Sequence, residues 1–533
     1  MKADGIVIKV EETGFYQGFN KTIAIVPKIL IGALLLWAVV DQQQAAALLA
    51  QANEWSTNQF GGWYIWVTAF YLSVCLLLAL WPTTGRVKLG RPDEVPEFSR
   101  FSWFSMMFGA GIGVGMLTYA TAEPIFHFTN NPDTILGATN SLDADNVRNA
   151  YKWAFLHYGL TPWGCYGIVG MSMGYFAYNR GMPLTIRTPL QPLLGDRVSS
   201  GIVGHMVDIV AILATIIGVA VTIGYGVSQF ASGFHNITGQ SWLLNADGSP
   251  TLAAQLTALI IVLGASTWSA MTGVNKGIKW LSNLNMGLSV FLLLFFVVFG
   301  ATMFALRTYF YGIWDYVTSL PIMSITVWPD DGSATGSALS DWQAGWTILY
   351  WAWWIAFAPF VGLFLARVSR GRTIREYVFG AMVVSSLMCF TWFALAGGTA
   401  IDLELRGIAE RSIVDADISA QLFKTVNLIL SPEFAILMSI VIVILLLTYL
   451  VTSADSAILI INTIASAGDQ SQKHARHILI WGFIYTAVIG ILLSVGGMEA
   501  LRSAMLVGAL PFSLVMALMA IGLIKSIAVD GHR

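Results

Sequence analysis

The stretch YWAWWIAFAPF, residues 350–360, lies inside an apolar run that extends from Trp346 to Ala366. This run is long enough to cross a membrane as a helix, which requires about 20 apolar residues. Tryptophan in membrane proteins is usually found at the two interfaces, where its N–H stays hydrated. Tryptophans in the middle of a span therefore indicate another role. Pro359, in the same stretch, predicts an interruption of the helix.

The composition of the whole chain is that of a membrane protein. Of its 533 residues, 56% are hydrophobic and only 11% are charged, whereas a soluble domain carries roughly 25% charged residues. The sequence therefore predicts an all-α polytopic membrane protein. We count twelve apolar runs of spanning length, at residues 23–41, 60–81, 101–127, 153–178, 203–232, 252–272, 279–305, 345–366, 376–400, 433–463, 477–496 and 500–525.

The distribution of basic residues predicts how these runs are oriented. Cytoplasmic loops of membrane proteins are enriched in Lys and Arg. With a cytoplasmic N-terminus, 21 of the 28 basic residues fall in cytoplasmic segments. This split favours an even number of spans with both termini in the cytoplasm. The outer segments keep only Arg148, Lys152, Arg307, Arg406, Arg411, Lys424 and Arg502.

Several functional classes are disfavoured by the same composition. A net charge of −2 does not indicate a nucleic-acid partner. The three cysteines, Cys75, Cys165 and Cys389, lie in or beside apolar runs without metal-ligand spacing. We find no nucleophile–base or metal-ligand constellation, so the sequence predicts that the protein is not an enzyme.

The third run contains alternating glycines in GAGIGVG, residues 109–115. Each glycine costs a helix about 1 kcal/mol relative to alanine. Close helix packing through small residues spaced by four is one explanation. The other is a discontinuous helix, because transporters use unwound backbone to bind ions and anionic groups of substrates. We favour the second, and expect the backbone around Gly111 and Gly113 to face the substrate.

The two interrupted runs, the third and the eighth, are five spans apart. An odd number of spans inverts the second unit relative to the first, as in the inverted repeats of secondary transporters. This predicts two preceding helices followed by a 5+5 inverted repeat. We divide the chain into a tail with two peripheral spans (1–100), a first repeat (101–305) and an outer connection with an interfacial helix (306–344). A second repeat (345–525) and a short tail (526–533) follow.

A second aromatic group lies in the fourth run, in HYGLTPWGCYG, residues 157–167, where Pro162 predicts a further interruption. Aromatic faces attract a cation that has no hydrogen to donate, such as trimethylammonium, by about 2 kcal/mol or more when desolvated. Interface anchoring or plain helix packing is the alternative. Because two such groups lie on separate spans beside predicted breaks, we favour a cation-binding site.

Residues 346–377, WTILYWAWWIAFAPFVGLFLARVSRGRTIREY, strongly resemble the signature segment of the betaine/choline/carnitine transporter (BCCT) family. GAGIGVG and TSADS, residues 452–456, match the family as well. The resemblance implies a leucine-transporter-like fold, usually a homotrimer. It implies a substrate site, here called the aromatic box, formed by Tyr158, Trp163, Tyr166 and Trp354. Betaine carriers usually have Trp in place of Tyr158, and often in place of Phe357, so the substrate is left open.

The resemblance also implies sodium sites. One would comprise the hydroxyls of Thr452 and Ser453 with the carbonyls of Tyr449, Gly109 and Ile112. Without the family resemblance, we would expect the two hydroxyls to form hydrogen bonds with the preceding turn of their own helix. A second site would use Thr215, but Val219 stands where the family has another threonine. Sodium is therefore the expected coupling ion, by one site or two.

Intramembrane acids are functional candidates. Glu123, Asp208 and Asp455 lie in or at the ends of the apolar runs. We expect each to be a structural hydrogen-bonding partner, and protonation-linked coupling is the alternative.

Together these features predict secondary active uptake of a small methylated onium osmolyte, such as glycine betaine, choline, carnitine or dimethylsulfoniopropionate. The expected mechanism is sodium symport by alternating access. A sodium-independent substrate/product antiporter is the alternative, and a channel is favoured less. The expected location is the cytoplasmic (inner) membrane of a bacterium, in contact with membrane lipid.

Overall fold

The computed structural model describes residues 6–111, 113–198, 201–272, 279–471 and 474–530. These residues form helices and contain no β-strand, which confirms the all-α prediction for the described chain. The α-helices are α1 Lys21–Val40, α2 Gln42–Leu80, α3 Arg100–Gly111, α4 Val114–Thr129, α5 Pro132–Ile135, α6 Val147–Tyr158, α7 Leu160–Gly174, α8 Gln191–Leu194, α9 Ile202–Thr238, α10 Leu252–Thr272, α11 Lys279–Phe299, α12 Thr302–Met323, α13 Ala334–Gln343, α14 Leu349–Val368, α15 Ile374–Val378, α16 Ser385–Trp392, α17 Gly398–Leu405, α18 Gln421–Ile429, α19 Pro432–Ala465 and α20 Ala475–Asp530.

Nine helical segments of the described chain are long and apolar enough to cross a membrane. The predicted runs 101–127 and 153–178 are each divided into two shorter helices. The last two predicted runs lie in α20, which is interrupted by non-helical backbone at Gly496 and Gly497. The polytopic class agrees with the prediction, and the count of twelve stays a prediction. The outer connection over 306–344 contains most of α12 and all of α13.

The predicted break in the third run is present. Helix α3 ends at Gly111 and α4 begins at Val114, with Gly113 at φ −149° and ψ −113° between them. Ile112 lies outside the described residues. The fourth run is broken at Gly159, between α6 and α7, and not at Pro162. Pro162 lies in the first turn of α7, where backbone N–H groups have no partner within the helix in any case.

The predicted interruption at Pro359 is wrong. Helix α14 continues through this residue from Leu349 to Val368, and its irregular part is a π-helical turn that precedes it, at Ala344–Ile348. Proline removes one backbone hydrogen bond, and neighbouring helices make that loss tolerable in membrane proteins. Pro359 is buried among such neighbours. The pairing of two broken helices therefore gives no support to the inverted repeat, which stays a prediction.

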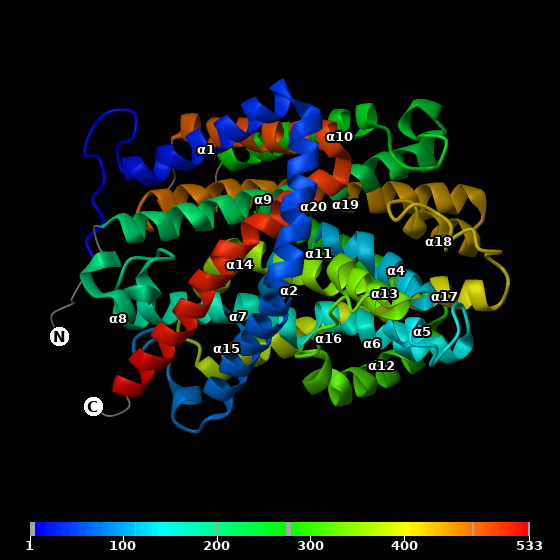
Figure 1. The fold of residues 1–533 in the computed structure, drawn as a ribbon, viewed down its shortest axis with the longest axis horizontal. Helices are drawn as coiled ribbons and strands as arrows, with labels where there is room; N and C mark the ends of the chain where they lie inside the picture. Colours follow the sequence, from blue (N-terminus) through cyan, green and yellow to red (C-terminus); the bar gives the residue numbers. More distant parts are fainter. Residues whose placement is uncertain (1–5, 112, 199–200, 273–278, 472–473, 531–533) are drawn as a thin grey trace.

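The predicted loops separate to two ends of the molecule (Figure 1). Helices α5, α13, α17 and α18, from segments assigned to the outside, lie toward the right of the view, whereas α8 and the last turns of α20 lie at the left. This separation is what alternating spans require. Which end faces the cytoplasm stays a prediction.

Helices α7 and α14 approach each other closely through glycine. A Cβ on Gly362 of α14 would lie 2.6 Å from Val169 Cβ and 3.1 Å from the backbone nitrogen of Gly170. On another face of α14, a Cβ on Gly218 of α9 would lie 3.0 Å from Ala356 Cβ. Small residues allow such close packing of membrane helices. The glycines thereby place the aromatic side chains of α7 and α14 against each other.

We expect Gly362→Ala to lower the melting temperature of the purified protein, because overpacking a tight contact costs about 1–3 kcal/mol. Gly32→Ala in α1 is the matched control, since a Cβ there would meet no atom within 4 Å. Both changes gain helix propensity, by about 1 kcal/mol, so only the contact differs. Equal melting temperatures for the two variants would contradict the proposed close packing.

Candidate functional site

Four aromatic rings from three helices meet, with Trp354 in contact with the other three. The centroid of Trp354 lies 4.7 Å from that of Tyr166, 5.4 Å from that of Trp163 and 5.9 Å from that of Tyr158. Tyr158 is the last residue of α6, Trp163 and Tyr166 are on α7, and Trp354 is on α14. All four side chains are buried. The structure therefore brings the residues of the aromatic box together, with Tyr158 and Trp163 on opposite sides of the break at Gly159.

The glycine-rich break adjoins the aromatic box. A Cβ on Gly115 would lie 3.7 Å from the hydroxyl of Tyr158 and 3.7 Å from the indole of Trp353. Two residues earlier, a Cβ on Gly113 would lie 3.4 Å from the ring of Tyr449 and 3.6 Å from Ser453 Oγ. The start of α4 thus has the aromatic box on one side and α19 on the other. Gly109 and Gly111 belong to the last turn of α3.

The residues predicted to bind sodium on α19 lie beside this break, but the hydroxyl of Thr452 already has partners. Its Oγ1 donates to the carbonyl of Thr448 at 3.0 Å or that of Tyr449 at 3.1 Å, and accepts from Asn285 Nδ2 at 3.1 Å. The hydroxyls of Tyr449 and Ser289 are 2.7 Å apart. A hydroxyl oxygen has two lone pairs, so Thr452 Oγ1 can keep these hydrogen bonds and still offer one lone pair to a sodium ion.

Thr215, the residue of the possible second sodium site, bonds within its own helix. Its hydroxyl donates to the Ala211 carbonyl at 2.8 Å, and the buried Val219 follows one turn later. Valine offers no side-chain oxygen, so the second site stays a prediction.

All three intramembrane acids are hydrogen-bonded and buried. Asp208 accepts a hydrogen bond from the guanidinium Nε of Arg187 at 2.7 Å, and Asp455 accepts one from the hydroxyl of Ser269 at 2.6 Å. Glu123 binds Tyr350, whose hydroxyl lies 2.5 Å from Oε2, and the imidazole of His157. These contacts confirm the expected role as hydrogen-bonding partners. A part in coupling stays a prediction.

Sequence reasoning missed several polar contacts around the site. Asn285 and Ser289, one turn apart on α11, reach α19 as described above. The indole N–H of Trp353 donates to the hydroxyl of Thr222 at 3.0 Å. Asn285 and Ser289 stand four positions apart in the apolar run 279–305, which places two polar side chains on one face of a helix. This spacing could have identified them from the sequence. Nothing local indicated Thr222.

Comparison with known proteins decides the family. The betaine/carnitine/choline transporter family model matches residues 22–532. The chain belongs to the BCCT family. It is 36% identical over 499 residues to the glycine betaine transporter OpuD of Bacillus subtilis, covering 94% of this chain and 93% of that protein. It is also 36% identical over 515 residues to a glycine betaine transporter of Acinetobacter baylyi, covering 95% of this chain and 73% of that one.

A further relative is named for a different solute. The chain is 34% identical over 501 residues to an ectoine/hydroxyectoine transporter of Virgibacillus pantothenticus, covering 94% and 95% of the two chains. This BCCT chain is thus a multi-pass membrane protein whose relatives transport osmolytes, and family membership bears out the prediction that it is a transporter and not an enzyme.

Proposed function

We propose that this BCCT protein accumulates a small methylated onium osmolyte by sodium symport, with the aromatic box as its central substrate site. The observation that carries the proposal is the meeting of Tyr158, Trp163 and Tyr166 around Trp354, beside the broken third span. Trimethylammonium offers no hydrogen to donate, so ring faces bind it better than oxygen ligands do.

The sodium part of the proposal is supported by the position of α19. Tyr449 and Ser453 lie against Gly113, and Gly115 lies against Tyr158. Gly113 and Gly115 are two residues apart, so an ion bound between α19 and the break would be separated from the aromatic box by about half a helical turn. Broken helices in transporters use unwound carbonyls to bind coupling ions. We further propose a homotrimer in the cytoplasmic membrane with both termini cytoplasmic, as the family resemblance implies.

We expect radiolabelled glycine betaine to accumulate in proteoliposomes at least ~10-fold faster under an inward sodium gradient than under a matched potassium gradient. The reason is that binding of the ion stabilises the state that binds the solute. Potassium replaces sodium because choline, a common substitute cation, is a candidate substrate. Liposomes without protein serve as the control for passive leakage of the labelled solute.

The antiporter alternative predicts a different result in the same vesicles. Uptake would be independent of sodium and would require unlabelled solute inside. The substrate class is tested separately by quenching of tryptophan fluorescence with glycine betaine, choline, carnitine, dimethylsulfoniopropionate and ectoine. Glycine, which carries N–H donors instead of methyl groups, should bind much more weakly. Binding of glycine as tight as that of glycine betaine would contradict a site selective for methylated cations.

A further inference from the structure

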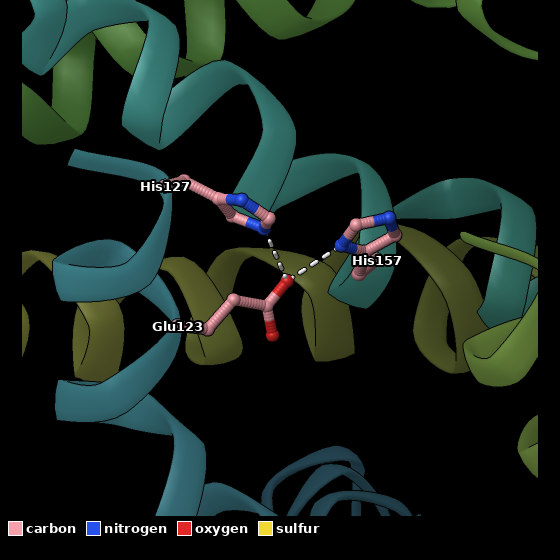
Figure 2. Close-up of side chains that lie close together, drawn as sticks. All are labelled: Glu123, His127 and His157. Carbon is pink, nitrogen blue, oxygen red and sulfur yellow. Dashed lines mark hydrogen bonds and ion pairs between the residues drawn. The ribbon is translucent and has the colours of Figure 1, made fainter. Parts of the chain in front are cut away.

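A cluster of metal-ligating side chains lies next to the aromatic box, and the proposed function does not use it. Glu123 and His127 are one turn apart on α4, and His157 is on α6. The Oε1 atom of Glu123 is 2.6 Å from His157 Nδ1 and 3.3 Å from His127 Nε2. Figure 2 shows both imidazoles turned toward this oxygen from two helices. We call these three residues the Glu–His cluster.

The ligand atoms of the Glu–His cluster are close together and shielded from water. One atom from each residue lies within 4.8 Å of the others. All three side chains have an exposed fraction of 0%. A four-residue spacing places Glu123 and His127 on the same face of α4, and the third ligand comes from a separate helix. This gives three convergent ligands from two helices.

Two of the three residues also have the outer contacts that orient metal ligands, whereas Nδ1 of His127 is buried without a hydrogen-bond partner among the described residues. His157 Nε2 is 3.0 Å from the hydroxyl of Thr347, and the hydroxyl of Tyr350 donates to the second oxygen of Glu123 at 2.5 Å. Metal-binding histidines typically direct their other ring nitrogen to such a partner, and ligating carboxylates are themselves hydrogen-bonded. With Nε2 held by Thr347, Nδ1 of His157 is left to face Glu123.

We propose that the Glu–His cluster binds one divalent transition metal ion of the zinc class. Two imidazoles and a carboxylate suit zinc and its neighbours, whereas calcium and magnesium prefer oxygen ligands. Tetrahedral zinc with bonds of about 2.0–2.1 Å holds adjacent ligand atoms about 3.3 Å apart. The contact of Glu123 with His127 already has this separation. The contact with His157 opens by about 0.7 Å when the ion replaces the hydrogen bond.

A cavity of about 340 Å³ lies beside the Glu–His cluster. It is lined by Trp342 and Trp346 among others. The imidazole of His127 packs against both indoles, with ring centroids 5.5 Å and 4.7 Å away. The two indoles that line the cavity are therefore direct neighbours of His127.

Metal binding would fix the outer part of the transport core. The ion would join α4 to α6, and its outer partners Tyr350 and Thr347 would join both to α14 and to the π-helical turn that precedes it. In alternating access one repeat moves against the other, and α4 and α6 belong to the predicted first repeat whereas α14 belongs to the second. Bound zinc would then slow transport. This consequence, unlike the binding itself, rests on the proposed function.

The binding is tested on full-length protein without a histidine tag, purified and stripped of metal. Cobalt(II), used as the probe, should bind at about one ion per chain and give the visible absorption of a tetrahedral site. We expect His127→Gln and His157→Gln each to weaken cobalt binding at least ~10-fold. His235→Gln is the matched control, because this imidazole, at the end of α9, bonds to the Gln240 carbonyl outside the cluster.

A second measurement keeps the test decisive if a variant folds poorly. Zinc should raise the melting temperature of the wild-type protein and of His235→Gln, but not that of His127→Gln. No tetrahedral cobalt spectrum, no rise with zinc, or equal cobalt binding by all variants would overturn the proposal. Inhibition of uptake by zinc, relieved in His127→Gln, would support the transport consequence. Metal binding without inhibition would leave the site in place and overturn only that consequence.

Discussion

Replacing Trp354 by leucine should weaken solute binding ~30-fold or more and reduce uptake correspondingly. Leucine keeps apolar volume in the site but has no ring to attract a cation. A desolvated cation–ring contact contributes about 2 kcal/mol or more, and each 1.4 kcal/mol changes affinity tenfold. Trp354 makes ring contacts with all three other members of the aromatic box, so its replacement removes the ring that the other three share. Uptake kinetics in proteoliposomes and fluorescence titration measure the effect.

Two further variants separate the loss of the ring from damage to the fold. Trp354→Phe retains an aromatic face and should keep most of the affinity, whereas Trp354→Ala should nearly abolish uptake. Truncation to alanine also leaves a cavity, so melting temperature and size-exclusion profile are measured for every variant. Equal affinity in Trp354→Leu and wild-type protein would remove the aromatic box as the cation site.

The break at Gly113 was predictable from local sequence, whereas the continuity of α14 was not. Alternating glycines weaken a helix wherever they occur, so GAGIGVG predicts its own break. The effect of a proline depends on its neighbours. Pro359 is buried in a continuous helix, and Pro162 lies just after the actual break, at Gly159. Neither outcome can be read from the proline alone.

The meeting of the four rings of the aromatic box was predictable because they come from two segments with distinctive composition and a family resemblance. The polar contacts were less predictable from the sequence. The i, i+4 pair of Glu123 and His127 could be read on a helix, but His157 joins it from 34 positions along the chain. The approach of Asn285 to Thr452 spans 167 positions. Such contacts depend on how helices pack, which a single sequence does not reveal.

Thr452→Val should raise the sodium concentration needed for half-maximal uptake ~10-fold or more. Valine has nearly the same shape as threonine and lacks only the oxygen. Losing one interaction with a charged group costs about 1.5–3 kcal/mol, which corresponds to ~10- to 100-fold in affinity. The change also removes the acceptor of the Asn285 amide, which lies 3.1 Å from Thr452 Oγ1. Initial uptake rates at fixed ionic strength, with potassium replacing sodium, measure the dependence.

Thr448→Val is the matched control, one turn earlier on α19. Its hydroxyl makes the same bonds to its own helix, 2.9 Å from the carbonyl of Ile444 and 2.9 Å from that of Leu445. Thr448 lies outside the proposed ion site, so its replacement should leave the sodium dependence unchanged. If both variants shift the sodium dependence equally, the effect belongs to the helix and not to an ion ligand. If neither does, Thr452 does not bind the coupling ion and its hydroxyl serves only the bonds to Thr448, Tyr449 and Asn285.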